Sequence, residues 1–254
     1  EHVTFHVWAR EFLEHFGYYD LFLIDRDGNI LYTFEKEDDF ATNLEDGPYA
    51  GSALGFVFQR ALKGRAERVI FSDYERYAPS DNAPALFAGT AVKAKDGSVA
   101  GVLAVQLADT PINAILRFGS AMGKTGETYL VGNDMTMRSQ SRFFSESTLL
   151  TTKVDTPSVN RGLAGFSGAH VTPDYRGISV LSVFSPVDFG GKPWVLLAEI
   201  DEAEVLARLR IWPAVIAALI AAMVGAFLSH IGLGILPRDS SGPGNNPGRI
   251  AKPF

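Results

Sequence analysis

Short runs of hydrophobic residues alternate with clusters of glycine, proline and polar residues along the chain, which predicts strands joined by tight turns. The stretch TYLVGNDMTMRS, residues 128–139, predicts a strand, a turn and a second strand. An earlier stretch, LFLIDRDGNILYT at residues 21–33, has the same form. We therefore predict that one antiparallel building block occurs twice in the chain.

The first copy is predicted to contain helices as well as strands. Phe5, Trp8, Phe12 and Phe16 recur three or four residues apart, which gives one aromatic stripe on a helix. The other elements predicted for this copy are a hairpin turn at residues 26–29, a helix over 54–61 that ends before Gly64, strands at 68–74, 85–92 and 99–107, and a helix that starts at 110–111.

The second copy repeats this order in fewer residues. Its predicted elements are the hairpin at 128–139, a loop and short helix within 143–164, a strand at 177–187, and a closing strand at 192–200 that leads directly into a helix after Asp201. The predicted fold class is α+β, with two tandem units that each have an antiparallel sheet flanked by helices.

One segment near the C-terminus is apolar throughout. AVIAALIAAMVGAFLSHIGLGIL, residues 214–236, has 23 residues and no charge. As a helix it would be about 34 Å long, enough to cross a bilayer core of about 30 Å. We predict a transmembrane helix, and a helix buried in a protein core is the alternative. Small residues recur at every fourth position, which either forms a groove for a second helix or reflects the abundance of alanine in such helices.

Composition excludes some classes of function. The chain has 254 residues, a formal charge of −6 and no cysteine. A net negative chain has no basic footprint for nucleic acid, so no nucleic-acid partner is expected. Without cysteine, disulfides and thiolate metal sites are excluded.

No arrangement of residues indicates catalysis. Ser167, His170 and Asp174 are close in sequence, but the glycines and proline around them predict a loop, and no strand-to-helix elbow surrounds a serine. The acidic run 35–39 is better explained as a solvated loop than as a cation site. His2 and His6 have the spacing of metal ligands but lack a third ligand, so we predict a solvated helix face. We expect no enzyme activity, no cofactor and no metal.

A binding pocket is the stronger candidate for function, because such pockets combine apolar walls with a few placed polar groups. The stretch SDYERYAPSDNAPALFAGT has this composition. An ordinary loop whose tyrosines pack on the sheet is an equal alternative. The candidate ligand-binding residues are Asp73, Tyr74, Tyr77, Ser80, Asp81 and Phe87.

Several stretches resemble the double Cache (PAS-like) sensor region of bacterial transmembrane receptors, of the methyl-accepting chemotaxis type. They are YYDLFLIDRDGNILYTFEKEDDFATNL, GPYAGSAL, GKTGETYLVGNDMTMRSQSRF, VDTPSV and WVLLAEIDEAE, within about residues 1–210. The resemblance implies the following parts: residues 1–17 in a long stalk helix, 18–118 as the membrane-distal unit, 119–201 as the membrane-proximal unit, 202–213 as a connecting helix, 214–236 as the membrane helix, and 237–254 as a cytoplasmic linker with a possible start of a HAMP relay module.

The resemblance also implies how the protein works. A small molecule would bind in the distal unit, outside the cytoplasm at a bacterial cell membrane, and the signal would pass through the membrane helix. The protein would be a homodimer through the stalk and membrane helices. A stalk along both units needs on the order of 40 residues, so we expect that the sequence lacks the start of this helix and a first membrane span. The composition of residues 239–248 favours a flexible linker.

Members of this family that bind amino acids carry an Arg-x-Trp-Tyr stretch, a Tyr-x-Asp and a later aspartate. Tyr77 matches the tyrosine, but Pro79 and Gln106 stand where the aspartates would be, and Arg-x-Trp-Tyr does not occur. The comparison therefore implies a ligand other than a free α-amino acid, and it leaves uncharged, carboxylate and aromatic ligands open. The expected function is a chemoreceptor sensor. The alternatives are the input region of a histidine kinase or a nucleotide or diguanylate cyclase, a membrane-anchored extracytoplasmic enzyme, and a structural assembly protein.

Overall fold

The computed structural model describes residues 2–64, 68–117 and 122–235, and within these the side chains of 2, 3, 208–214 and 226–235 are not described. The chain divides into two compact units, residues 1–205 and 206–254. The predicted boundary at 118/119, Leu236 of the predicted membrane helix, and the predicted linker and HAMP start at 237–254 lie outside the described residues.

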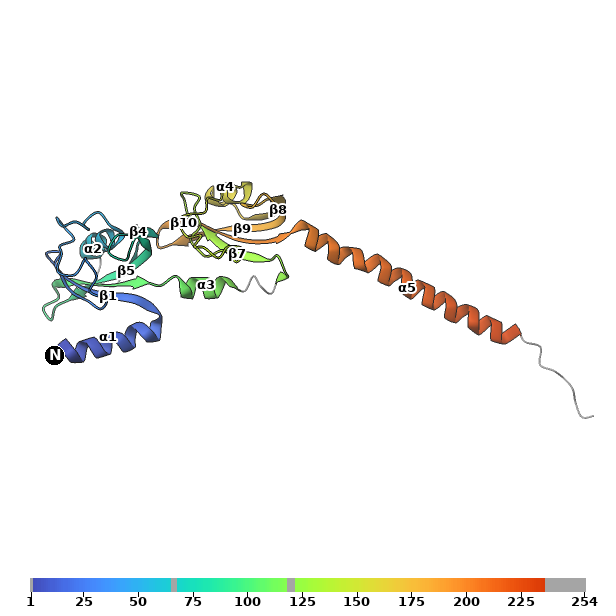
Figure 1. Cartoon of the computed structure of the whole chain (residues 1–254), viewed down its shortest axis with the longest axis horizontal. Helices are drawn as coiled ribbons and strands as arrows, with labels where there is room; N and C mark the ends of the chain where they lie inside the picture. The colour runs from blue at the N-terminus through green and yellow to red at the C-terminus, as the bar shows by residue number, and fades with distance from the viewer. Residues whose placement is uncertain (1, 65–67, 118–121, 236–254) are drawn as a thin grey trace, which may run out of the picture. The chain divides into compact units, whose positions relative to one another are not determined.

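The first sheet in the 1–205 unit has six antiparallel strands, in the order β2-β1-β6-β5-β3, with β4 also paired to β5 (Figure 1). The strands are β1 (Tyr18–Asp25), β2 (Ile30–Thr33), β3 (Ile70–Phe71), β4 (Glu75–Tyr77), β5 (Ala83–Lys93) and β6 (Val99–Leu107).

Helices cover both faces of this sheet because side chains alternate along each strand. Phe22 of β1 is buried in a cluster with Leu54 of helix α2 (Ala53–Lys63). Leu21, its neighbour, is buried in a different cluster with Leu13 of helix α1 (His2–Phe16). The predicted helix with the aromatic stripe is thus confirmed over residues 2–16, and the predicted helix over 54–61 is confirmed within α2.

Helix α2 is capped at both ends, and its predicted end before Gly64 is confirmed. The hydroxyl of Ser52 accepts a hydrogen bond from the backbone amide of Gly55 at 3.2 Å, which caps the N-terminus. At the other end, Gly64 donates its amide to the carbonyl of Ala61. The two caps fix where the helix begins and ends.

The second sheet has four antiparallel strands, in the order β7-β10-β9-β8. They are β7 (Glu127–Val131), β8 (Gly168–Pro173), β9 (Ser179–Phe189) and β10 (Lys192–Asp201), and helix α4 (Pro157–Leu163) packs on them. In both sheets the opening strand pairs with the closing strand, which pairs with the strand before it. Gly190 and Gly191 form the turn between β9 and β10 with φ of 57° and 85°, a conformation that favours glycine.

Two predictions for the second sheet are wrong. Residues after the turn at 132–134 do not form a strand. Their contact with β7 is a single isolated bridge between Met137 and Val131. The segment is held by side chains instead: the hydroxyl of Ser139 accepts the amide of Leu130 at 3.0 Å. The loop predicted around His170 is strand β8, which pairs along β9.

Helix α3 (Thr110–Leu116) follows β6, as predicted from Thr110–Pro111, and helix α5 (Glu202–Ile235) follows β10 with no intervening loop. Large apolar side chains of α5, including Leu219 and Met223, are more than half exposed. In the part of the chain that the structure describes, no helix meets both the length and the apolar character required to cross a membrane.

Candidate functional site

A pocket of about 300 Å³ lies where the ends of β1 and β6 meet the loop before β5. Tyr19 comes from β1, Gln106 from β6, and Ser80 from the loop. Ser147 and Leu149 close it from a later segment. The full lining is Tyr19, Glu37, Ser80, Asp81, Ala83, Pro84, Gln106, Leu107, Ala108, Asp109, Ser147 and Leu149.

A chain of hydrogen bonds crosses the pocket through Glu37. Tyr19 donates its hydroxyl to one carboxylate oxygen of Glu37 at 2.7 Å, and Ser80 donates to the other at 2.7 Å. Because the Ser80 hydrogen points to Glu37, its oxygen is left to accept from Nε2 of Gln106 at 3.3 Å. This hydrogen bond fixes the orientation of the Gln106 side-chain amide, and its Oε1 atom is left without a hydrogen-bond donor in the described part of the chain.

Two further carboxylates lie behind the pocket wall, and both are fully buried. Tyr77 donates its hydroxyl to Oδ2 of Asp39 at 2.6 Å. Oδ1 of Asp20 accepts the backbone amides of Leu21 and Phe34 at 2.6 Å and 2.7 Å. Backbone donors from two segments therefore hold Asp20 in place at the start of the sheet.

Three acceptor atoms here have no hydrogen-bond partner among the described residues. They are Oδ2 of Asp20, Oδ1 of Asp39 and Oε1 of Gln106. A buried acceptor without a donor costs about 1–3 kcal/mol. Asp20 and Gln106 are register partners on β1 and β6, so two of the three lie side by side. The site therefore has more hydrogen-bond acceptors than hydrogen-bond donors.

Burial changes the proton affinity of both buried acids. Desolvation raises the pKa of Asp20 to about 7, against the opposing effect of its backbone hydrogen bonds, and the nearby charge of Asp39 adds to the rise. Desolvation also raises the pKa of Asp39, and the charge of Glu37 contributes. A positive charge placed here would offset both effects.

The arrangement suits a cation that donates hydrogen bonds. Glu37, Asp81 and Asp109 line the pocket, and no lysine, arginine or histidine is among its described lining residues. An ammonium group has three donors and no acceptor, which complements unpaired carboxylate and carbonyl oxygens. The pocket is also negative enough to repel a carboxylate ligand.

The six residues predicted for ligand binding do not all lie together. Ser80 and Asp81 line the pocket. Tyr77 and Phe87 are buried behind it, where their rings meet edge to face at 4.9 Å. Tyr77 still reaches the site through Asp39. The prediction of ligand contact stays a prediction for these four residues.

Asp73 and Tyr74 lie elsewhere, in contact with the second sheet. Asp73 pairs with Arg138 at 2.8 Å and accepts Nε1 of Trp194 at 3.2 Å. The ring of Tyr74 stacks on Trp194 at 6.3 Å. These contacts make Asp73 and Tyr74 part of the packing between the two sheets, and the pocket lining does not include them.

Sequence reasoning missed the acids that shape the site. Asp20 follows the alternation of β1, on the same face as buried Phe22, so a carboxylate replaces an apolar residue at an inward position. A carboxylate at an inward-facing position of a predicted strand could have indicated that Asp20 is a buried functional acid. Asp39 lies in the acidic run 35–39, which was predicted to be a solvated loop; that prediction is wrong for Asp39, which is buried, although its neighbour Asp38 is exposed.

Other candidate groups do not assemble into a reactive site. Nε2 of His170 contacts the hydroxyl of Ser158 at 3.0 Å, whereas Ser167 contacts Ser185 and Asp174 pairs with Arg176. Within the described residues, no group of three histidine, cysteine, aspartate or glutamate side chains is placed to hold a metal ion.

Comparison with known proteins gives a consistent picture. A family model described as the Cache domain, dCache_1, matches residues 9–209. No curated protein sequence matches the chain.

Three solved structures share the fold at low sequence identity. The ligand-binding domain of the Pseudomonas aeruginosa PAO1 chemoreceptor PctB with L-Arg is 16% identical, with a TM-score of 0.50 over 74% of this chain and 73% of that one. The domain of Pseudomonas fluorescens chemoreceptor CtaA with L-isoleucine is 14% identical, with a TM-score of 0.50 over 75% and 72%. The extracellular domain of rpHK1S-Z16, which carries the name of a histidine kinase, is 13% identical, with a TM-score of 0.54 over 80% and 78%.

Proposed function

Because the chain belongs to the Cache domain family, we propose that it is the ligand-sensing region of a transmembrane receptor, most simply a chemoreceptor. The same fold occurs in the ligand-binding domain of a chemoreceptor and in an extracellular domain that bears a histidine kinase name. A histidine kinase or a nucleotide or diguanylate cyclase is therefore the alternative output. In either case the pocket binds and does not catalyse.

The proposed organisation follows the sequence analysis. Residues 18–118 form the membrane-distal unit and 119–201 the proximal unit, and the shared strand order of the two sheets supports one module used twice. Residues 1–17 belong to the stalk, 202–213 connect, and 214–236 cross a bacterial cell membrane with the sensor outside the cytoplasm. Exposed apolar side chains of α5, among them Ile216, Leu219 and Met223, favour a lipid environment.

We propose further that the pocket of about 300 Å³ lined by Glu37, Asp81 and Asp109, here called the acidic pocket, binds a small organic cation such as a primary amine. The three unpaired acceptors beside an acidic pocket carry this proposal. A free α-amino acid is disfavoured, because its carboxylate would find no cation among the described lining residues. A ligand of this class would pair with Glu37 in the pocket lining, and its charge would offset those of Asp39 and Asp20 buried behind it.

A thermal-shift experiment on the full chain in detergent tests this proposal. Ethanolamine and putrescine should raise the melting temperature, and ethylene glycol, the uncharged counterpart of ethanolamine, should not. Glu37→Gln should weaken amine binding at least about tenfold, the scale of one charge-assisted hydrogen bond. Asp39→Asn should weaken it less, because Asp39 is buried behind the pocket and acts on the ligand only through its charge.

Asp38→Asn is the matched control, since Asp38 is exposed next to buried Asp39. It should leave amine binding unchanged. The proposal fails if neither amine shifts the melting temperature, or if both site variants bind the amines as the wild type does.

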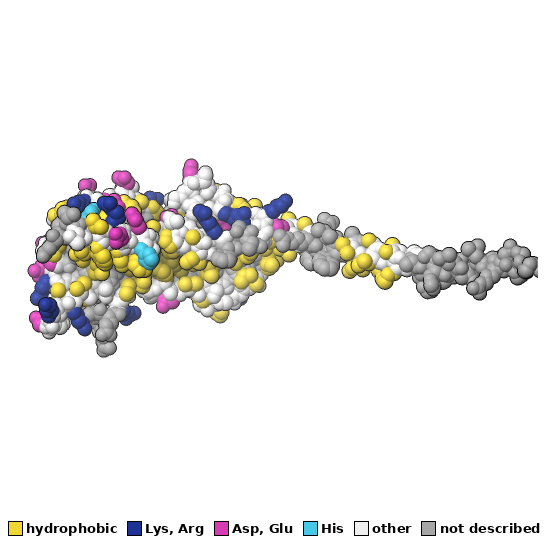
Figure 2. Space-filling view, turned by 90° about the horizontal axis from the view of Figure 1, so that it is seen from below, with side chains coloured by type: hydrophobic (Ala, Val, Ile, Leu, Met, Phe, Trp, Pro, Cys, Tyr) yellow, Lys and Arg dark blue, Asp and Glu magenta, His cyan; other side chains and the backbone are white. Residues whose placement is uncertain are grey.

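The proposed dimer rests on helix α1. Val7, Trp8 and Phe16 are 51%, 48% and 52% exposed there. Figure 2 shows hydrophobic side chains gathered on the face of the molecule that carries this helix. A second copy of α1 would cover them. Trp8→Glu should then shift the sedimentation coefficient toward that of a monomer, and an unchanged coefficient would count against this interface.

A further inference from the structure

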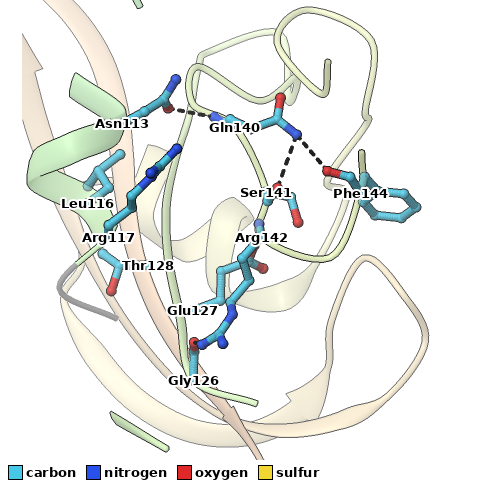
Figure 3. Close-up of a pocket in the computed structure, with 10 residues that line it drawn as sticks. All are labelled: Asn113, Leu116, Arg117, Gly126, Glu127, Thr128, Gln140, Ser141, Arg142 and Phe144. Atoms are coloured by element: carbon cyan, nitrogen blue, oxygen red, sulfur yellow. Dashed lines mark hydrogen bonds between the residues drawn. The ribbon is translucent and has the colours of Figure 1, made fainter. Parts of the chain in front are cut away.

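A larger pocket, of about 420 Å³, lies beside the second sheet (Figure 3). Three elements form it: helix α3, the start of β7, and the loop after residue 139. It shares no lining residue with the acidic pocket. Its lining is Asn113, Leu116, Arg117, Gly126, Glu127, Thr128, Gln140, Ser141, Arg142 and Phe144.

The loop wall of this pocket is held in shape by one side chain. The two hydrogens of Gln140 Nε2 are shared among the carbonyls of Ser141, Phe144 and Glu146, which lie at 2.9–3.0 Å. The backbone amide of Gln140 in turn donates to Oδ1 of Asn113 on α3 at 2.8 Å (Figure 3). The two walls are therefore tied together, so the pocket is largely formed before a ligand enters.

The charge of this pocket is opposite to that of the first. Arg117 and Arg142 are exposed and come from different walls, and neither forms an ion pair with a carboxylate among the described residues. Arg142 donates to the carbonyl of Gly126, which uses one of its five N–H groups. Each guanidinium therefore has donors left for a ligand.

Glu127 is the one acid among the described lining residues, and its oxygens are already occupied. It is 3% exposed, one oxygen accepts the backbone amide of Arg142 at 2.7 Å, and the other accepts the hydroxyl of Tyr175 at 2.6 Å. The carboxylate thus holds the base of the loop and does not pair with either guanidinium. The pocket presents positive charge.

We propose that this pocket is a second binding site, which takes a small carboxylate with an apolar body. A guanidinium fork matches the two oxygens of a carboxylate. Leu116 and Phe144 supply apolar walls for the rest of the ligand. A volume of about 420 Å³ is sufficient for a small molecule. The site is independent of the proposed amine pocket.

Isothermal titration of the full chain in detergent, with benzoate and hexanoate as probes, tests the proposal. At least one carboxylate should bind, and its uncharged amide, benzamide or hexanamide, should bind at least about tenfold more weakly. Arg117→Gln and Arg142→Gln should each lower carboxylate affinity at least about tenfold. Arg117→Gln is the safer variant for folding, because the Arg142 side chain also donates to the backbone carbonyl of Gly126.

Two controls separate this site from the rest of the protein. Arg60→Gln removes an exposed arginine from α2 and should leave carboxylate affinity unchanged. Asp39→Asn should also leave it unchanged, so failure of the amine proposal would not affect this result. The proposal is overturned if neither carboxylate binds, if acid and amide bind equally, or if both arginine variants bind like the wild type.

Discussion

Arg138 donates hydrogen bonds to both carboxylate oxygens of Asp73, at 2.8 Å and 3.3 Å, although 65 residues separate them in sequence. Asp73 follows β3 of the first sheet, and Arg138 follows β7 of the second. The Arg138 side chain is 4% exposed. The pair therefore joins the two sheets through a buried guanidinium and a partly buried carboxylate, which is 21% exposed.

Removing the cation of this pair should destabilise the protein strongly. Arg138→Met leaves a half-buried carboxylate with Trp194 as a remaining donor, and loss of one partner of a buried pair costs about 3–5 kcal/mol. Trp194 fluorescence during guanidinium unfolding would measure the loss. Arg161→Met, at an exposed position on α4, should change the free energy of unfolding little.

Asp73→Asn tests where Asp73 acts. We expect lower stability and an unchanged affinity for ethanolamine, because Asp73 does not line the acidic pocket. Titration calorimetry would measure the affinity. A loss of ethanolamine binding in a folded variant would restore Asp73 to the ligand site that the sequence predicted.

Stability should fall as the pH rises from about 4 to about 7, through Asp20. Burial raises the pKa of this group from 3.8 to about 7, so between these values the folded protein holds a proton that the unfolded chain has lost. The contribution is fully present below 3.8 and lost above about 7, with a slope of up to about 1.4 kcal/mol per pH unit.

Asp20→Asn should remove this part of the pH dependence. Urea unfolding at several pH values would compare the slopes, with Asp38→Asn as a control that keeps the wild-type slope. Equal slopes for wild type and Asp20→Asn would show that Asp20 is not the group responsible.

Amine binding should strengthen over the same pH range. A cation near Asp20 and Asp39 favours their charged forms, so binding displaces protons when these acids are protonated. The apparent affinity for ethanolamine should rise as the pH approaches 7 and then level. Calorimetry in two buffers with different ionisation enthalpies would count the protons released. A pH-independent affinity would contradict this linkage.

Gly162→Ala should destabilise the second sheet despite the better helix propensity of alanine. A methyl group at this position of α4 would lie 2.4 Å from Cγ1 of Val195 on β10. We expect a loss of about 1–3 kcal/mol, typical of overpacking. Gly51→Ala, where a methyl would meet nothing within 4 Å, is the control, and adding Val195→Ala should recover part of the loss.

The regular elements of this protein could be predicted because their signals are local. The hairpin turn at Asp27–Gly28 and the end of α2 at Gly64 depend on residues next to them in sequence. β8 was missed because it has no apolar-polar alternation: its one buried side chain is Thr172, whereas Val171 is exposed. Glycines and Pro173 around it look the same in a loop and in an edge strand.

The site was harder to predict because its parts are distant in sequence. Tyr77 and Asp39 are 38 residues apart, and only the fold shows that they share a hydrogen bond. A tyrosine-rich stretch suggested where the site is, and Ser80 and Asp81 do line the pocket. The same stretch also contains Asp73, whose partners Arg138 and Trp194 come from the other sheet. Composition does not distinguish these two roles.

Strand β10 ends at Asp201, and helix α5 begins at the next residue. A loop at this joint would have dihedral angles that rotate independently, and a small movement of the strand would be averaged out among them. Thr125 tightens the joint, since its hydroxyl oxygen accepts the amide of Asp201 and its hydroxyl hydrogen goes to Glu204. A displacement of strand β10 would therefore be passed directly to the first turn of helix α5, because no flexible residues lie between them.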